Sequence, residues 1–327
     1  MGRVLIVGAT GQLGTAVLQR LRASGRPVRA FVRPMSPRDA LEGSGAELAF
    51  GDLRDAGSVE AACRGVETVV ATANAVVPRG PASFEETEEH GYANLIEACR
   101  AAEVRRFIFM SVPVTPHDKE VETFRMKRLI ERQIQKSGIP STIFRGSLFM
   151  DDWFALMGST IPLRGADAHT LRRPFWFPRI FLGLVGRLIE KRGLALVPGS
   201  GRARHAFIAL DDVAAFLAKA VELAGTESTV HEIGGPEVLS WEDVVGVFAR
   251  VLARPVRALH TPIGFYRLTT ALLDPFSPAA ANLMAMSRLC AVTDTAFATE
   301  GLARLFDIPL TSAEQFLRRK LALPEEA

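Results

Sequence analysis

The sequence predicts an α/β protein: a doubly wound, parallel-sheet Rossmann fold with a smaller, mostly helical subdomain. Two observations carry this prediction. A glycine-rich turn joins the first apolar strand to a helix, and strand-like and helical segments then alternate four times within about 110 residues. Such alternation is typical of a parallel sheet with helices on both faces, so we expect the Rossmann domain at residues 1–146 and 203–235. The subdomain is expected at residues 147–202 and 236–327.

The first strand and the turn after it form a candidate phosphate site. Residues 4–7 are apolar and β-compatible, as in a buried parallel strand, and the turn Gly8-Ala9-Thr10-Gly11-Gln12-Leu13-Gly14 opens a helix. Gly8 allows the tight turn, Gly11 lets backbone N–H groups approach a pyrophosphate, and Gly14 lets the helix pack against the strand. The whole turn, with Thr10, Gln12 and Leu13, is therefore a candidate dinucleotide-binding site at a helix N-terminus.

Arg33 indicates which dinucleotide the protein prefers. Further strands are expected at residues 28–32, 46–50, 68–74, 105–111 and 141–145. Arg33 follows the second of the chain's strands, where an NAD-selecting protein usually carries Asp or Glu. Its planar cation suits a 2′-phosphate, and Arg38 lies nearby in the sequence, so NADP(H) is favoured. The alternative is a solvated loop arginine in an Arg-rich chain.

Three stretches resemble a known family. The glycine turn, Asn94-Leu95-Ile96-Glu97-Ala98-Cys99 and Val104-Arg105-Arg106-Phe107-Ile108 are similar to the NmrA-like branch of the atypical short-chain dehydrogenase/reductase superfamily. The resemblance implies a NAD(P)-binding Rossmann fold, and it implies that Asp52 and Leu53 contact the adenine. Asp52 has an alternative role as the cap of a helix at residues 56–63. Ala73, one of several small residues ending the strand at 68–74, leaves space for a cofactor ribose.

The same resemblance implies a lysine at the reaction centre, and Lys127 matches its position. Ordinary members carry Tyr four residues earlier, where this chain has Thr123. Lys127 is therefore a candidate catalytic residue and a contact to the nicotinamide ribose, because a desolvated lysine can exchange protons near neutral pH. The alternative is an exposed helical lysine paired with Glu131. His117 is a second candidate, as an acid that replaces the missing Tyr, or else a surface histidine.

Residues 147–202 and 236–327 are expected to form the substrate side. A helix is expected at residues 180–190, but its apolar run is far shorter than the roughly 20 residues that span a bilayer. Segment 171–191 is interpreted as a lid over an apolar substrate, a peripheral membrane contact, or a plain core helix. Residues 78–87, rich in Pro, Gly and acidic side chains, are expected to form an exposed loop.

Composition excludes several classes of partner and compartment. A net charge of +3 is too small to indicate nucleic acid. The cysteines Cys63, Cys99 and Cys290 show neither a disulfide framework nor metal-ligand spacing, so we expect no metal and a reducing cytoplasm. The first strand begins at once, which leaves no room for a signal peptide.

Two functions are compatible with these features. The first is an NADPH-dependent reductase that transfers hydride to a small, apolar, electron-poor acceptor such as a quinone, enone or aromatic intermediate. Such acceptors need little proton donation, which suits a site without the usual Tyr. The alternative is a non-catalytic, NADP(H)-binding redox sensor or assembly factor that acts through protein partners. An oligomer is compatible with either.

Overall fold

The computed structural model describes residues 2–37, 41–74, 85–165, 171, 176–223 and 227–323, and it confirms the predicted α/β class. The chain divides into two compact units. The first comprises Met1–Arg145 and Val213–His231, and the second comprises Gly146–Asp212 and Glu232–Ala327.

A seven-stranded sheet in the order β3-β2-β1-β4-β5-β6-β9 organises the first unit. The neighbouring strands from β3 to β6 all pair in parallel. The strands are β1 (Arg3–Val7), β2 (Val28–Val32), β3 (Glu47–Phe50), β4 (Val66–Ala71), β5 (Arg106–Ser111), β6 (Ser141–Gly146) and β9 (Thr229–Ile233). The strand order reverses between β1 and β4, and doubly wound sheets bind their ligands beyond the carboxyl ends of the strands at such a point.

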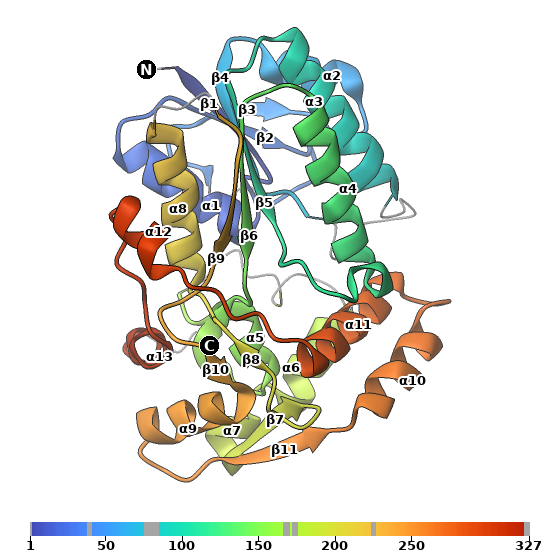
Figure 1. Ribbon diagram of the computed structural model, residues 1–327, viewed down its shortest axis with the longest axis vertical. Helices are drawn as coiled ribbons and strands as arrows, with labels where there is room; N and C mark the ends of the chain where they lie inside the picture. The colour runs from blue at the N-terminus through green and yellow to red at the C-terminus, as the bar shows by residue number, and fades with distance from the viewer. Residues whose placement is uncertain are drawn as a thin grey trace. The chain divides into compact units, whose positions relative to one another are not determined.

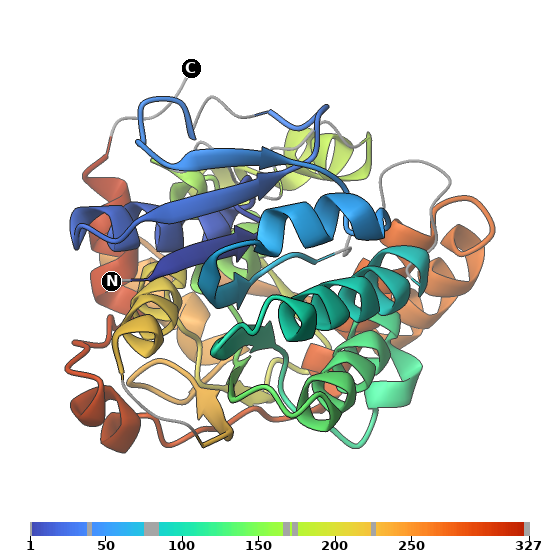
Figure 2. The same cartoon turned by 90° about the horizontal axis from the view of Figure 1, so that it is seen from above.

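Helices cover both faces of this sheet (Figures 1 and 2). Helices α1 and α8 lie on one face, and α2, α3 and α4 lie on the other. Their bounds are α1 (Gln12–Ala23), α2 (Ala56–Cys63), α3 (Gly91–Ala101), α4 (Glu122–Lys136) and α8 (Leu210–Glu222), with a π-helix η2 (Glu85–His90) and a 3-10 turn η3 (Asp118–Glu120). Helix α1 packs through Val17, Leu18 and Leu21, none of which is exposed.

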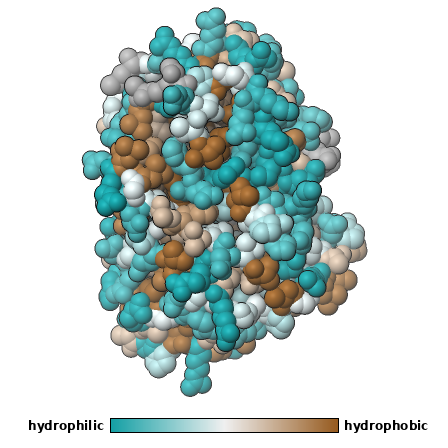
Figure 3. Space-filling model, viewed as in Figure 1, coloured by the Kyte–Doolittle hydropathy of each residue, from teal (hydrophilic) through white to brown (hydrophobic). Residues whose placement is uncertain are grey.

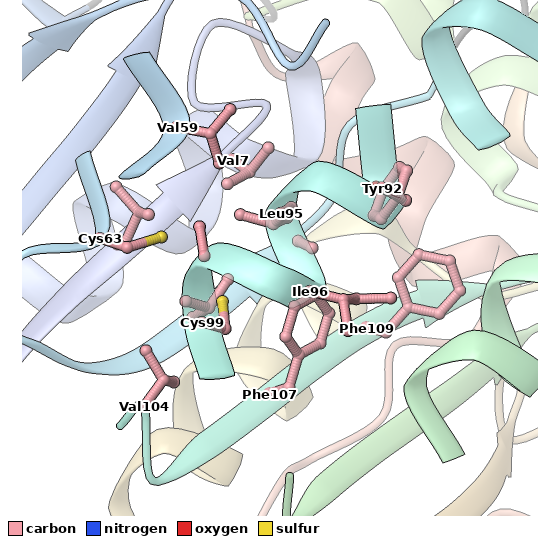
Figure 4. Packing of buried hydrophobic residues seen from close by; sticks show 14 of the residues in the cluster. Val7, Val59, Cys63, Tyr92, Leu95, Ile96, Cys99, Val104, Phe107 and Phe109 are labelled. Atoms are coloured by element: carbon pink, nitrogen blue, oxygen red, sulfur yellow. The ribbon is translucent and has the colours of Figure 1, made fainter. Parts of the chain in front are cut away.

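The core between α2, α3 and the sheet is closely packed and apolar (Figure 4). Cys63 of α2 and Cys99 of α3 lie side by side within it, and their thiols share a hydrogen bond. Phe109 of β5 packs edge-on against Tyr92 of α3, with the ring centroids 5.4 Å apart. This aromatic pair fixes Tyr92, in the first turn of α3, against β5.

Two segments of the first unit differ from their predicted structure. Strand β4 covers Val66–Ala71 and not residues 68–74, because its partner β1 ends at Val7, which pairs with Ala71. Apolar character alone does not show where a partner strand ends. Of the loop expected at residues 78–87, residues 78–84 lie outside the described part of the chain, and residues 85–87 belong to the π-helix η2.

The second unit is mostly helical around an aromatic core. Phe154 lies at its centre and packs against Phe207, Phe248 and Phe316. The elements are α5 (Met150–Leu156), η4 (Ile161–Leu163), α6 (Trp176–Val185), α7 (Leu188–Arg192), β7 (Leu194–Pro198), β8 (Arg204–His205), β10 (Leu239–Ser240), α9 (Trp241–Val251), β11 (Arg257–Thr261), α10 (Ile263–Leu273), α11 (Pro278–Val292), α12 (Glu300–Leu305) and α13 (Ala313–Leu321). Strand β11 pairs in parallel with β7, and β10 pairs antiparallel with β8.

The single helix predicted at residues 180–190 is two helices, α6 and α7. The helical geometry is lost at Arg187, directly after Gly186, a residue type that disfavours helix interiors. Leu184, within the predicted apolar run, is largely exposed. No helix within the described ranges is long and apolar enough to cross a membrane. Residues 172–175 lie outside those ranges, and a lid or membrane role for segment 171–191 stays a prediction.

Candidate functional site

At two positions of the first turn only glycine fits, because other backbone atoms lie too close for a Cβ atom. Gly8 has φ +94°, and a Cβ atom there would lie 2.6 Å from the backbone nitrogen of Ala73. At Gly14 a Cβ atom would lie 2.1 Å from the carbonyl oxygen of Gly8. The turn after β1 is thus pressed against the end of β4 on one side and the start of α1 on the other. Any larger residue would open it.

The N-terminus of α1 is left open by the residues that build it. Gly11 is the N-cap residue and has no side chain, while its N–H donates to the Gly8 carbonyl oxygen at 2.9 Å. The Thr15 hydroxyl donates to the Ala9 carbonyl oxygen at 2.9 Å and fixes the turn. The first turn of α1, which the structure describes completely and which includes Gln12 and Leu13, carries no acidic side chain. Its N–H groups and dipole can therefore hold an anion.

Arg33 and Asp52 lie near one another beyond the ends of β2 and β3. Arg33 is exposed, and its charge contributes to lowering the pKa of Asp52. The main cause of this lowered pKa is Arg54, whose guanidinium donates two hydrogen bonds of 2.9 Å to the Asp52 carboxylate. The sequence analysis missed Arg54, although its place two residues after Asp52 was a signal. Arg38 lies outside the described residues.

The alternative role of Asp52 as a helix cap is wrong. Asp55 caps α2, because it stands directly before the helix and accepts a hydrogen bond from the Gly57 N–H at 3.2 Å. Leu53 is buried, with its carbonyl oxygen bonded to the Asn94 side chain at 2.9 Å. The structure thus leaves the Asp52 side chain outside α2 and fixes Leu53 against α3.

Lys127 lies in the interior of the first unit and is 2% exposed. Its Nζ donates to the Ala73 carbonyl oxygen at 3.3 Å and lies 3.9 Å from the Glu88 carboxylate. The same atom is 5.6 Å from the centre of the Tyr92 ring and 4.9 Å from that of Phe109. Burial lowers the pKa of Lys127, and the charge of Glu88 opposes this effect.

The alternative of an exposed lysine paired with Glu131 is wrong. Glu131 is itself buried, and its carboxylate oxygens lie 2.7 Å from guanidinium nitrogens of Arg128 and Arg145. It also accepts a hydrogen bond from the Ser111 hydroxyl at 2.5 Å. Two arginines therefore neutralise Glu131, and the Lys127 ammonium instead donates to the Ala73 carbonyl oxygen.

The structure supplies a tyrosine that the sequence analysis did not find. Tyr92, in the first turn of α3, donates its hydroxyl to the Ala73 carbonyl oxygen at 2.7 Å. Tyr92 and Lys127 therefore meet at one acceptor, although they are 35 residues apart in the sequence. Burial raises the pKa of Tyr92, so the phenol keeps its proton. The chain has only two tyrosines, and that scarcity was the one available signal.

His117 lies apart from this cluster in the contacts of the described residues. Its imidazole Nδ1 is 2.6 Å from the Glu120 carboxylate, and both side chains are about half exposed. The structure brings Gly8, Ala73 and Lys127 together at the carboxyl end of β4, and leaves His117 with Glu120. A catalytic role for His117 stays a prediction.

Comparison with known proteins identifies the family. Residues 1–297 match the NmrA-like family. The protein belongs to the NmrA-like family. The predicted family is thereby confirmed. This NmrA-like protein is 24% identical to photosystem II assembly factor Ycf39 of Cyanophora paradoxa over 81% of its chain and 73% of the relative. It is 26% identical to NAD(P)H azoreductase of Xenophilus azovorans over 78% of its chain and 75% of that protein.

Solved structures share its fold. The NADPH-dependent quinone oxidoreductase QOR2 of Escherichia coli, complexed with NADPH, aligns with a TM-score of 0.73 at 19% identity. The alignment covers 97% of the NmrA-like chain and 99% of the oxidoreductase. The predicted Rossmann fold is confirmed, and the predicted cofactor and oxidoreductase class agree with what these names state.

Proposed function

We propose that this NmrA-like protein is an NADPH-dependent reductase that transfers hydride to a small, apolar, electron-poor acceptor such as a quinone, enone or aromatic intermediate. The observation that carries the proposal is the buried Lys127, joined with Tyr92 at the Ala73 carbonyl oxygen beside the glycine turn. The names of the azoreductase and of the quinone oxidoreductase support the same class of acceptor.

The residues present fit NADPH. The backbone of residues 8–14 forms a cradle that a Cβ atom at Gly8 or Gly14 would fill, and the open N-terminus of α1 suits a pyrophosphate. Arg33 would hold the 2′-phosphate, and Asp52 and Leu53 would contact the adenine. Ala73 and Lys127 would lie at the nicotinamide ribose. When bound, NADPH supplies the hydride.

Lys127 and Tyr92 would have different roles at the end of β4: Tyr92 positions the backbone, and Lys127 binds cofactor and acceptor. The Tyr92 hydroxyl is bonded to the Ala73 carbonyl oxygen, so it holds the segment that follows β4 in place. Within the described part of the chain, Lys127 uses one N–H donor for its bond to Ala73, and an ammonium has three. These donors can bind ribose hydroxyls and stabilise negative charge on the reduced acceptor. An acceptor that needs little further proton donation fits this arrangement.

Replacing Lys127 tests the proposal. Lys127→Met alone would remove the cation beside the buried Glu88 carboxylate, and breaking a buried ion pair costs about 3–5 kcal/mol, so we choose the double variant Lys127→Met/Glu88→Gln. NADPH consumption is measured with menadione and with azo dyes. We expect turnover by the wild type and a loss of about 10²–10⁴ in kcat for the double variant.

The control is Lys136→Met, which removes an exposed lysine at the end of the same helix and is expected to keep wild-type turnover. If the folded double variant reduces menadione at the wild-type rate, Lys127 is not at the reaction centre.

A second function, that of a redox sensor or assembly factor, is favoured by the similarity to Ycf39 over most of the chain. Apolar side chains at helical spacing on and just after α10 are also exposed: Phe265, Leu268, Leu272 and Phe276. A protein partner would cover such side chains. The face drawn in Figure 3 shows separate apolar patches and no single large one. Equal affinities for NADPH and NADP⁺, with no consumption of NADPH by any acceptor, would favour this function.

A further inference from the structure

Glu88 is a buried carboxylate on the π-helix that leads into α3. Its side chain is 1% exposed, whereas the next two residues, Glu89 and His90, reach the surface in part or fully. A carboxylate is almost never buried unless a cation compensates it. The cation here is Lys127, with Nζ 3.9 Å from Glu88 Oε2 and a side chain that is itself 3% exposed. π-helical turns are frequent at functional sites, and this one directs Glu88 inward.

Among the described residues, the groups that face Lys127 from other elements are uncharged apart from Glu88. Lys127 faces the Tyr92 phenol from α3, the Phe109 ring from β5, and the Ala73 carbonyl oxygen after β4. On its own helix, the charges that act on Lys127 are those of Arg128 and Glu131, and Glu131 is bonded to Arg128 and also to Arg145.

A lysine buried among aromatic rings without a compensating charge would release its proton. Glu88 is placed to prevent this release.

We propose that Glu88 is a positioning residue that keeps Lys127 protonated and holds its ammonium beside the Ala73 carbonyl oxygen. The catalytic consequence rests on the proposed reductase function, because only then does the charge of Lys127 act on ribose and acceptor. The charge state itself does not depend on turnover. Without Glu88, Lys127 would become a neutral amine within the working pH range, and its three donors would be reduced to two.

The test follows the Lys127 side chain directly by NMR, with ¹³C at the Cε position of lysine. The chain has only six lysines, and loss of one signal in Lys127→Arg assigns Lys127. In the wild-type protein we expect Lys127 to be charged at pH 7. In Glu88→Gln, which keeps the shape and removes the charge, we expect its pKa to fall by about one unit or more, a tenfold change in the ratio of ammonium to amine. Glu89→Gln, at the adjacent residue, is the matched control and should leave the pKa of Lys127 unchanged.

Two results would overturn the proposal. One is a wild-type Lys127 that is neutral at pH 7, which decides the matter even if Glu88→Gln does not fold. The other is a folded Glu88→Gln in which the pKa of Lys127 equals that in Glu89→Gln.

The pH profile of menadione reduction adds an independent readout, since its alkaline limb should move to lower pH in Glu88→Gln. Absence of turnover in the wild type would count against the reductase alone, because the NMR titration still reports on Glu88.

Discussion

Arg33 and Arg54 are two exposed arginines whose charges both lower the pKa of Asp52. Arg54 is bound to that carboxylate by two hydrogen bonds, whereas Arg33 acts on it through its charge. Of the two, Arg33 directly follows β2, the strand that usually leads to the ribose-binding residue. We therefore expect Arg33 to recognise the 2′-phosphate and Arg54 to hold Asp52.

Arg33→Ala should weaken NADPH binding by about 10- to 100-fold, because a hydrogen bond to a charged group contributes about 1.5–3 kcal/mol. NADH lacks the 2′-phosphate, so its affinity should not change. Isothermal titration calorimetry with both dinucleotides measures this difference, and Arg54→Ala serves as the comparison. Equal losses for NADPH and NADH in Arg33→Ala would show that the side chain does not recognise the phosphate.

Single residues also mark where prediction from the sequence ends. Lys127 could be placed because a local motif surrounds it. Glu88 and Tyr92 could not, because they reach Lys127 from another helix and are separated from it by 39 and 35 residues. An acidic stretch next to Pro and Gly is typical of an exposed loop, and the sequence does not show that the buried lysine on α4 lies beside one of its carboxylates. Such pairings depend on tertiary contacts that no local pattern contains.

At the scale of elements, the junction of β1 and α1 allows binding to be separated from folding. Gly11 has φ −83° and ψ 162°, a conformation that any residue can adopt. Gly11→Val should therefore fold normally and abolish dinucleotide binding, since its side chain occupies the approach to the helix N-terminus. Gly14→Val should also lose about 1–3 kcal/mol of unfolding free energy, because its Cβ would meet the Gly8 carbonyl oxygen.

Urea unfolding and calorimetric titration of both variants give the two quantities. Normal NADPH affinity in a folded Gly11→Val would remove the glycine turn from the phosphate site.

The elements themselves were predicted with unequal success, for a physical reason. The strands β1, β2 and β6 agree with their predicted bounds to within one residue, because glycine, proline or charged residues end each apolar run. The helix predicted at residues 180–190 is wrong, since the apolar spacing continues across Gly186 while the helix does not. Helical periodicity indicates which residues share a face, but not whether the backbone stays continuous.

At the scale of the whole molecule, stability should depend on pH through a buried histidine that takes no part in the proposed dinucleotide site. His205, in the second unit, is 0% exposed. Its Nε2 lies 2.9 Å from the Cys290 carbonyl oxygen, which can only accept, so Nε2 carries the proton. Its Nδ1 then accepts from the Thr295 hydroxyl at 2.8 Å. Burial lowers the pKa of His205 to about 4, so the folded protein keeps this imidazole neutral.

In the unfolded chain the same imidazole has a pKa of about 6.5. Between pH 6.5 and pH 4 the unfolded state therefore binds a proton that the folded state does not, and stability falls as the pH falls through this window. Buried Asp151 and Asp212 have raised pKa values and act in the opposite direction, so the total slope does not isolate His205. The difference in this slope between the wild type and His205→Gln isolates the contribution of His205.

Between pH 7 and pH 4.5, we expect the free energy of unfolding, measured with urea, to fall by roughly 2 kcal/mol more in the wild type than in His205→Gln. The variant will be less stable at pH 7, because it loses the ring contacts with Phe207 and Trp241, but this loss does not depend on pH. Parallel curves for the two proteins across the window would mean that His205 is protonated in the folded state, and that the Thr295 hydroxyl acts as acceptor for its Nδ1.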